Sequence, residues 1–360
     1  MDAWCRAMDA IYVFAVLLAV FWILVNLFYR RLRLAESGVV ELHSYVILVF
    51  KKGVGWAPRP SRRIRVYNAA STLLYFLSLA LFTYSALASV LGRLRTGSSG
   101  VVVLVPGVNI VGVDLLFFLA SVSIAASLHE YLHAVFALRN GVPVKSYGVM
   151  LLLILPLAYV EVDEEAFRKA GRGGRIGVLS AGVAVNLALA FASMLLLSAM
   201  SSPIGVLVTG VEEGSPAYEH GVQVYDVIVS VNGTPVRGIG DIPVVRKLAK
   251  PTVLEVAVWR SGSGIVNLTI PIGVGDERIG VYLSPAPSTW LISSLGASAA
   301  LAAYRFTMWM WIVNFSLALL NAAPLFVTDG GRVIGELAGE KWGRVINAAS
   351  LLLFIAMILP

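Results

Sequence analysis

The chain has 360 residues, of which 58% are hydrophobic and only 14% are charged, and its mean hydropathy is +0.82. Soluble proteins average about 25% charged residues, so too few polar side chains are present to cover a water-facing surface, and disorder, collagen and coiled coil are excluded too. The net charge of +7 indicates cytoplasmic loops of a membrane protein rather than a nucleic-acid partner. The single cysteine, Cys5, excludes an internal disulfide framework and a zinc site built from several thiolates.

Several apolar segments are long enough to cross the hydrocarbon core, which takes about 20 residues of helix. They lie at about residues 10–29, 68–92, 112–138, 175–200, 296–321 and 344–359. The first one lacks a small-residue cleavage site and ends at Arg30 and Arg31, so we expect a retained anchor. The sequence therefore predicts a polytopic α-helical membrane protein with about six transmembrane helices.

The lysines and arginines give the orientation of these spans. Residues 30–66 carry nine of them against two glutamates, which predicts a cytoplasmic loop. Threading the spans from there places residues 139–174 and 322–343 on the same side and residues 201–295 outside. We therefore expect a multi-pass integral protein of the cell (plasma) membrane.

Two shorter apolar stretches are interrupted by residues that break regular helices. Pro106 and Gly107 interrupt residues 100–112, and Pro156 interrupts residues 147–160. Because lipid-exposed irregular backbone is not tolerated, such a stretch is expected to lie against protein as a strand-like or re-entrant piece.

Residues 203–284 differ from their surroundings, because apolar and polar residues alternate there and turn signals such as Asn232-Gly233 separate the runs. This pattern predicts a small α/β domain, mainly β, inserted on the extracytoplasmic side. The expected organisation is an N-terminal membrane region (1–99), a first part of the membrane core (100–202), the inserted domain (203–284) and a second part of the core (285–360).

The third apolar run contains His129-Glu130-Tyr131-Leu132-His133, and ionisable groups inside a span are functional suspects because they are expensive there. His129 and His133 lie four residues apart on one helix face and can bind one metal ion. Glu130 is rotated by about 100° and can take a proton from the attacking water without binding the metal. This is the H-E-x-x-H pattern of zinc hydrolases. The alternative, two histidines hydrogen-bonded in a helix bundle, is disfavoured because two of only four histidines fall in this pattern.

A catalytic zinc takes three protein ligands, and a carboxylate is the expected third one. Asp114 lies roughly 22 Å along the helix axis from His129, which is too far. Glu161 heads an acidic run that we expect to be solvated. Asp329 is the best candidate, because Pro324 should break the fifth span and let the chain bring this aspartate to the histidines. The competing interpretation is a solvated aspartate in a helix-ending turn.

Asn186 is a further polar group inside an apolar span. A buried asparagine can join helices through hydrogen bonds. It can equally donate a hydrogen bond to the substrate backbone or to a developing oxyanion. Both interpretations stay open.

These residues resemble the site-2 proteases, which are intramembrane zinc metalloproteases. The resemblance rests on three motifs in the family's order: His129-Glu130-x-x-His133, Gly182-x-x-x-Asn186, and Asn321-x-x-Pro324 followed by Asp329-Gly330. Val105-Pro106-Gly107-Val108-Asn109 resembles the branch that includes the animal enzyme. The resemblance covers about residues 100–335.

The resemblance implies regulated intramembrane proteolysis, the hydrolysis of a peptide bond in or near the transmembrane helix of a membrane-bound substrate. The implied site is one Zn²⁺ bound by His129, His133 and Asp329, water activation by Glu130, and Asn186 and Asn321 as substrate-positioning or oxyanion residues. Two positions depart from the family. Leu132 stands where glycine is usual, which affects helix packing more than chemistry, and Thr328 stands where leucine is usual.

The inserted domain resembles a single PDZ module. The matching residues are 213–217, Gly221, 226–228 and 231–233. The resemblance implies that Ile204, Gly205 and Val206 form a loop that captures a peptide C-terminal carboxylate. The other interpretation, slightly favoured, is a steric filter that excludes substrates with bulky extracytoplasmic domains.

Two functions from different classes follow from the sequence. The first is an intramembrane zinc endopeptidase with a transmembrane protein substrate, whose active site faces the cytoplasmic side of the bilayer. For this endopeptidase, the strand-prone residues 142–160 are a candidate for pairing with a substrate strand. The alternative is a catalytically inactive membrane scaffold or receptor that binds partners through its PDZ-like domain. The complete set of His129, Glu130, His133 and Asp329 argues against the alternative.

Overall fold

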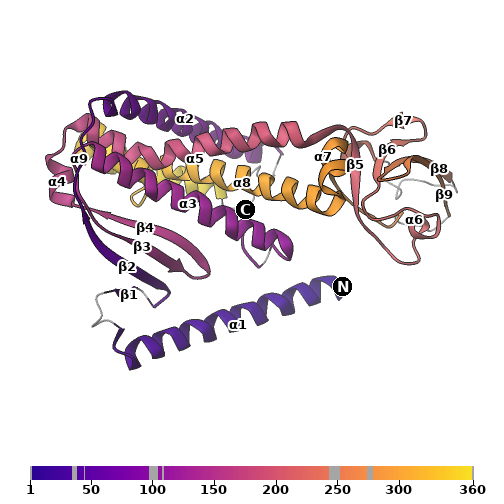
Figure 1. Cartoon of the computed structure of the whole chain (residues 1–360), viewed down its shortest axis with the longest axis horizontal. Helices are drawn as coiled ribbons and strands as arrows, with labels where there is room; N and C mark the ends of the chain where they lie inside the picture. The colour runs from indigo at the N-terminus through magenta and orange to yellow at the C-terminus, as the bar shows by residue number, and fades with distance from the viewer. Residues whose placement is uncertain are drawn as a thin grey trace. The chain divides into compact units, whose positions relative to one another are not determined.

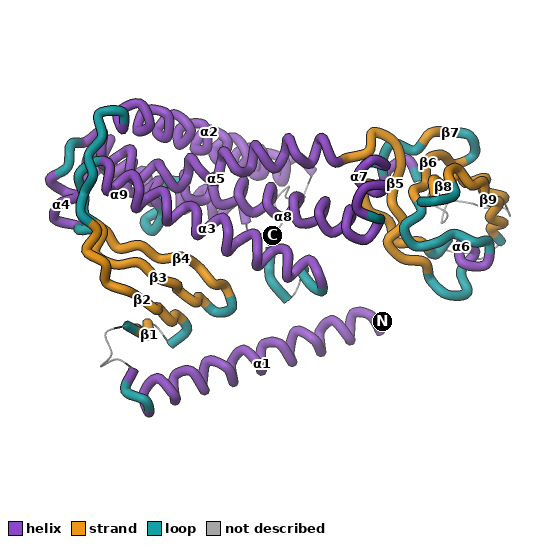
Figure 2. Tube along the Cα trace, viewed as in Figure 1, coloured by secondary structure: helices purple, strands orange, loops and turns teal. Residues whose placement is uncertain are grey.

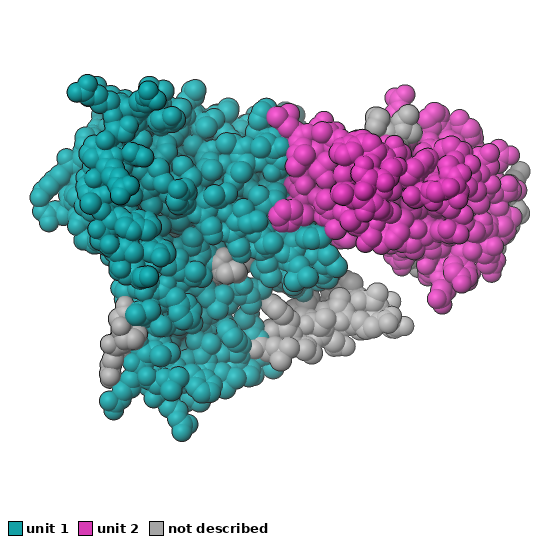
Figure 3. Space-filling model, viewed as in Figure 1, with its two compact units in different colours: residues 1–193, 309–360 teal, residues 194–308 magenta. Residues whose placement is uncertain are grey.

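The computed structural model describes residues 2–34, 39–43, 45–96, 104–107, 109–242, 252–273 and 279–358. The chain forms two compact units, shown in different colours in Figure 3. The first unit contains residues 1–193 and 309–360, and the second contains residues 194–308.

Long helices make up most of the first unit (Figure 1). They are α1 (Asp2–Arg31), α2 (Ile64–Thr96), α3 (Val113–Arg139), α5 (Arg172–Met200), α8 (Ala297–Ala322) and α9 (Asp329–Ile358), of which α5 and α8 continue into the second unit. Within the described residues, four of them are long and apolar enough to cross a membrane: α2, α3, α5 and α9. The chain is therefore an integral membrane protein with helical spans.

The break between α8 and α9 follows from the sequence around Pro324, as predicted. The helix α8 ends at Ala322, and α9 begins at Asp329. The last helix starts earlier than the predicted span at residue 344, because it is helical on both sides of a kink at Gly339, whose φ is 78°. The span pattern detected only the apolar part after that kink.

A four-stranded antiparallel sheet belongs to the first unit (Figure 2). Its order is β1 (Val40–His43), β2 (Ile47–Trp56), β3 (Val144–Leu152) and β4 (Leu155–Val162). Residues 30–66, predicted as a loop from their charge, thus contribute two strands. The sequence hides this, because β2 carries Lys51 and Lys52 and pairs with a strand almost one hundred residues away, as in Phe50 opposite Val149.

The strand-like interpretation of residues 142–160 is confirmed, because β3 and β4 form an antiparallel hairpin there. The sheet meets the helices through β4, which packs against α3. The short helix α4 (Glu164–Lys169) follows, and the Asp163 carboxylate caps it by accepting a hydrogen bond from the Ala166 amide at 2.8 Å. In the other interrupted stretch, an isolated bridge joins Pro106 and Ile110, and Val108 lies outside the described residues.

The second unit is built around one β-sheet of order β10-β5-β6-β8-β9, with β7 beside β6. The strands are β5 (Ser201–Val211), β6 (Val227–Val231), β7 (Thr234–Pro235), β8 (Thr252–Arg260), β9 (Gly264–Ile272) and β10 (Val281–Pro287), with the helices α6 (Pro216–Glu219) and α7 (Thr289–Leu295). Its core consists of β-branched and leucine side chains such as Val208, Ile228 and Ile270, as expected for alternating strands. The predicted inserted domain, residues 203–284, falls inside this unit.

Candidate metal centre

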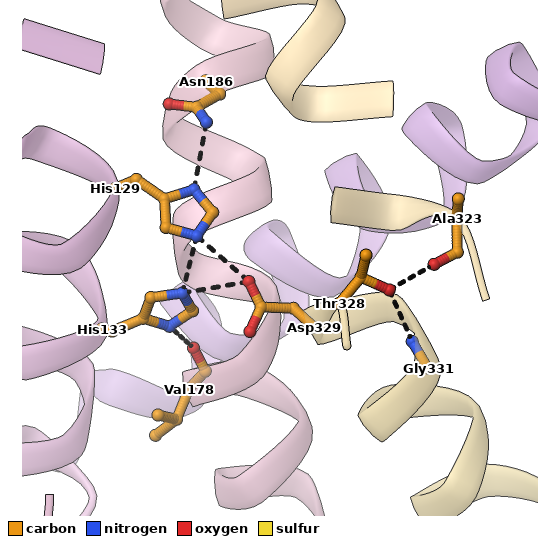
Figure 4. A network of polar contacts seen from close by, with 8 residues as sticks. All are labelled: His129, His133, Val178, Asn186, Ala323, Thr328, Asp329 and Gly331. Atoms are coloured by element: carbon orange, nitrogen blue, oxygen red, sulfur yellow. Dashed lines mark hydrogen bonds and ion pairs between the residues drawn. The ribbon is translucent and has the colours of Figure 1, made fainter. Parts of the chain in front are cut away.

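Three polar side chains from two helices meet inside the first unit (Figure 4). His129 and His133 lie one turn apart on α3, and their Nε2 atoms are 3.0 Å apart. Asp329, the first residue of α9, places Oδ2 at 3.1 Å from the Nε2 of His129 and 3.2 Å from that of His133. The side chains are only 9%, 13% and 16% exposed, in that order. The predicted ligand set is therefore assembled, and the interpretation of Asp329 as a solvated turn residue is wrong.

The spacing of these three atoms fits a bound metal ion. Zinc bonds to nitrogen and oxygen ligands are about 2.0–2.2 Å long, so neighbouring ligands of a tetrahedral site are about 3.3 Å apart. The observed separations of 3.0, 3.1 and 3.2 Å are close to that edge. Two imidazole nitrogens and one carboxylate are also the donor set of catalytic zinc sites. The side chains present thus fit a divalent metal, with His129, His133 and Asp329 as its ligands.

The other ring nitrogens are held by α5. His133 donates from Nδ1 to the backbone oxygen of Val178 at 2.7 Å, which leaves the lone pair on Nε2 for a metal. The Nδ2 atom of Asn186 lies 3.0 Å from Nδ1 of His129, while its buried Oδ1 has no partner. A metal bound at Nε2 of His129 would leave the ring proton on Nδ1, and a half-turn of the Asn186 amide would then present Oδ1 as the acceptor.

Gly182 explains how α5 approaches this closely. A Cβ at this position would collide with the imidazole ring of His129. The ring therefore lies against the bare backbone of α5, and any side chain at residue 182 would displace it. The glycine and the asparagine of the Gly182-x-x-x-Asn186 motif act on the same histidine, one by making room and the other by hydrogen bonding.

Asp329 is positioned by the turn that precedes it. The Oγ1 atom of Thr328 donates to the backbone oxygen of Ala323 at 2.6 Å and accepts from the amide of Gly331 at 3.2 Å (Figure 4). This is an N-terminal cap of α9. A Cβ at Gly330 would collide with the carbonyl of Ala322, and one at Gly331 with the carbonyl of Leu325. These glycines are needed for close packing rather than for backbone freedom.

Glu130 lies next to the ligands and faces a small cavity. One oxygen of Glu130 and one ring nitrogen of each histidine lie within 4.8 Å of one another. The cavity has a volume of about 140 Å³ and is lined by Glu130, His133, Asp329 and residues of β4, including Val160. Glu130, His133, Asp329 and a strand edge therefore surround a space large enough for water.

The acids excluded as ligands by sequence have other partners. Asp114 accepts a hydrogen bond from Nε1 of Trp309 at 3.0 Å. Glu161 is half-buried rather than solvated, because it accepts hydrogen bonds from Ser146 at 2.6 Å and Tyr159 at 3.2 Å. Burial and the adjacent Glu161 charge raise the pKa of Tyr159. Pairing of β3 with β4 thus places this acid beside two hydrogen-bond donors and partly shields it from solvent.

Two further predictions concern Asn321 and the carboxylate-binding residues of the second unit, which form no hydrogen bond with His129, His133 or Asp329 within the described residues. Asn321 is half-buried near the end of α8, and its side chain forms no hydrogen bond within the described residues. In the second unit, Ile204, Gly205 and Val206 lie within strand β5, between β10 and β6, and not in a loop as predicted. The amide of Gly205 donates to the backbone oxygen of Val236 at 2.8 Å, so it is not free for a peptide carboxylate. Peptide capture there stays a prediction.

Sequence reasoning missed three contributors to this site. Val178 acts through its backbone carbonyl, which leaves no side-chain signal. Val160 and its strand edge reach the cavity only because β4 packs on α3. Thr328 was a detectable signal, since threonine directly before an aspartate that follows a proline break is a common helix N-cap.

A pair of histidines four residues apart, an adjacent glutamate and an aspartate from another helix, all in or next to apolar spans, form the arrangement that the resemblance to the site-2 proteases implies. A comparison with known protein families supports this resemblance. The sequence profile of peptidase family M50 matches residues 117–359, and the chain belongs to this family.

Three similar proteins show how far the likeness extends. An uncharacterized protein of Methanocaldococcus jannaschii is 32% identical over 236 residues, 64% of this chain and 60% of the relative. Probable periplasmic serine endoprotease DegP-like proteins are 30% identical over 175 residues in Pseudomonas fulva and 36% identical over 92 residues in Rhizobium meliloti. These two matches cover 46% and 25% of this chain, and 34% and 17% of the relatives. The chain thus spans less than two thirds of each relative.

Proposed function

We propose that the protein is a zinc endopeptidase that hydrolyses a peptide bond in or near the transmembrane helix of a membrane-bound substrate. One observation carries the proposal: Nε2 of His129, Nε2 of His133 and Oδ2 of Asp329 converge to within 3.0–3.2 Å beside Glu130. The ligands belong to α3 and α9, which have the length and apolarity of membrane spans. A site at this depth meets substrates that are themselves in the membrane.

The residues of the chain have distinct parts in the reaction. When bound, zinc supplies a Lewis acid that polarises the scissile carbonyl. Glu130 takes a proton from the attacking water and delivers it to the leaving amine. Asn186 holds His129 in one orientation, and in the proposal Asn186 and Asn321 also position the substrate strand. The partly closed cavity limits the access of bulk water to the reacting groups.

A transmembrane helix hides its peptide bonds, so the substrate must unwind before it is cut. The unwound segment can bind along the free edge of strand β4. Within the described part of the chain, β4 pairs on one side only, with β3, and its Val160 and Val162 line the cavity beside Glu130. An extended substrate segment adding to this edge would lie next to the general base. Helix-weakening residues near the cleaved bond are therefore expected in substrates.

The proposal includes the number of membrane spans and their orientation. With α1 and α8 added to the four apolar helices, the chain would have six spans, with the site toward the cytoplasm and the β-rich unit outside the plasma membrane. The PDZ-like resemblance of that unit supports a role in admitting substrates. We favour a size filter over peptide capture, because the Gly205 amide already has an internal acceptor.

The decisive experiment compares wild type with Glu130→Gln on a panel of single-span substrates. Removing the general base should lower cleavage by about 10²–10⁴-fold, while zinc stays near one per chain because Glu130 is not a ligand. The matched control is Glu165→Gln, which alters an exposed glutamate paired with Lys169 and should cleave like wild type. Equal cleavage by Glu130→Gln and wild type would reject the mechanism.

Metal analysis separates the protease from the scaffold alternative. The protease requires stoichiometric zinc that is lost in His129→Ala. A purified chain that binds no zinc but still recruits protein partners would support the scaffold instead.

A further inference from the structure

A second and larger cavity lies in the first unit, away from the ligands of the metal centre. Its volume is about 900 Å³, within the range of roughly 300–1,000 Å³ that is usual for ligand sites. It is formed where α2 begins, α3 ends and α5 begins, so three segments distant in sequence contribute to it. Within the described residues, its lining contains three arginines and no aspartate or glutamate.

The charge of this cavity is largely uncompensated. Arg65 and Arg139 are exposed, and within the described part of the chain neither forms an ion pair or a side-chain hydrogen bond. Arg172 donates to the backbone oxygens of Glu336 at 2.9 Å and Leu337 at 2.8 Å, so it adds charge while two of its donors are already used. Arg65 and Arg139 are therefore the side chains free to bind an anion, and a guanidinium matches a phosphate in geometry.

The floor of the cavity is a built polar contact rather than a chance gap between helices. Asn68 and Asn140 exchange two side-chain hydrogen bonds, at 2.8 and 3.1 Å. A Cβ at Gly177 would collide with Asn68, and one at Gly174 would lie 2.9 Å from Oδ1 of Asn140. The two glycines let α5 close against this pair. At Gly173, by contrast, a Cβ would meet nothing within 4 Å, so the rim stays open.

The other part of the lining is apolar and runs along α2. Ile64, Ala69, Leu73 and Phe76 line it from that helix, and Ile176 lines it from α5. Phe76 lies eleven residues beyond Arg65, about 16 Å along the helix axis at 1.5 Å per residue. The arginines lie at the ends of candidate membrane spans, Arg65 at the start of α2 and Arg139 at the end of α3, whereas Phe76 lies inside α2. The cavity is thus cationic at one end and apolar along its depth.

We infer that this cavity is a binding site for an anionic phospholipid, with the phosphate on Arg65 and Arg139 and the upper acyl chain along Ala69, Leu73 and Phe76. Basic pockets between helices at the end of a span are suited to lipid headgroups. A free phosphate shares the headgroup chemistry but uses none of the apolar lining, so the apolar groove favours the lipid. The inference is independent of proteolysis, since no residue of the metal centre lines the cavity.

The test is native mass spectrometry of the purified full-length protein titrated with phosphatidylglycerol, phosphatidylcholine or inorganic phosphate. Wild type should retain one phosphatidylglycerol in preference to phosphatidylcholine, and equimolar phosphate should not displace it. Each of Arg65→Gln and Arg139→Gln should weaken phosphatidylglycerol binding about fivefold, equivalent to ~1 kcal/mol. Ala69→Trp should weaken it by filling the groove without changing charge. The control, Arg62→Gln with Arg63→Gln, removes two exposed charges outside the lining and should bind within twofold of wild type.

Several results would overturn the inference. Binding that is unchanged in the Arg65→Gln and Arg139→Gln double variant would remove the proposed contacts. An equal loss in the Arg62→Gln and Arg63→Gln control would indicate general surface charge. Displacement by phosphate, or normal binding by Ala69→Trp, would indicate an ion site without a lipid chain. Zinc content checks the fold of every variant, and a double Arg→Lys variant that keeps the charge should bind within about threefold of wild type.

Discussion

Among the described residues, Asp226 of the β-rich unit and Asp329 of the helical unit both have shielded side chains, and they differ in what surrounds them. In the β-rich unit, Asp226 is 1% exposed and accepts two hydrogen bonds from Arg260, at 2.7 and 2.8 Å, and one from the Gln223 amide at 2.9 Å. In the helical unit, Asp329 faces the two imidazoles of His129 and His133 and no lysine or arginine forms an ion pair with it in the described residues. One aspartate has a permanent counter-charge, and the other does not.

This difference separates a structural carboxylate from a functional one. Arg260 is always protonated, so its bidentate pair with Asp226 is satisfied without a ligand. Neutral imidazoles carry no charge and present lone pairs when their other nitrogens hold the protons, as the His133 contact with Val178 enforces. The Asp329 cluster could therefore accept a cation from outside the chain, as we propose, whereas the Asp226 cluster is already complete.

Asp329→Asn should have the largest effect of the variants considered, and the property that it changes is zinc affinity. Removing a group that only hydrogen-bonds to a metal ligand costs about 10–100-fold in metal affinity. Loss of the charged ligand itself should therefore cost more than about 100-fold. Zinc titration with a chelating competitor measures the change. Asp226→Asn serves as the control and should bind zinc like wild type. Equal zinc affinity in Asp329→Asn and wild type would mean that another group is the third ligand.

Asp226→Ala should lower the stability of the β-rich unit. Removing one partner of a buried ion pair costs about 3–5 kcal/mol. Because the Arg260 side chain is 21% exposed, we expect a loss at the lower end, about 3 kcal/mol. Hydrogen exchange of β6 and β8 measures the local stability. The exposed pair of Glu165 and Lys169 gives a control, since Glu165→Ala should change exchange little. Unchanged protection of β6 in Asp226→Ala would show that the pair contributes no stability.

Gly182→Ala tests whether the helix approach positions the first ligand. The new Cβ would displace the His129 ring, so zinc affinity should fall by about 10–100-fold. Gly173→Ala is matched in helix and chemistry, but its Cβ would meet open space, so its zinc affinity should stay at the wild-type value. Should both variants bind zinc alike, close packing at residue 182 would be irrelevant to the site.

Thr328→Val should have the smallest effect. It keeps the shape of the side chain but removes the hydroxyl that caps α9, which is worth about 1 kcal/mol. A lower thermal midpoint of the metal-free protein and a severalfold weaker zinc affinity are expected. Thr328→Ser retains the hydroxyl and should stay near wild type. A midpoint for Thr328→Val equal to that of Thr328→Ser would contradict the role of the cap.

The sequence predicted that His129, His133 and Asp329 come together, because the exceptions to a strongly apolar pattern are few. The four-residue spacing of His129 and His133 fixes their shared face in any helix, and Pro324 marks the break that precedes Asp329. The same local logic predicted the strand character of residues 142–160 and the strands of the second unit, since each depends on residues close together in the chain. These features are determined by neighbours in the chain.

Other features depend on residues that are far apart in sequence. No local pattern pairs β2 with β3, or brings Val160 of β4 to Glu130. Likewise, the reason for Gly182 is the ring of His129 more than fifty residues earlier, and the partner of Asn68 is Asn140. By itself the sequence determined which side chains can bind a metal. Only the tertiary structure decided that α5 comes close enough to orient them and that three helix ends enclose a cationic cavity, because both depend on packing between distant segments.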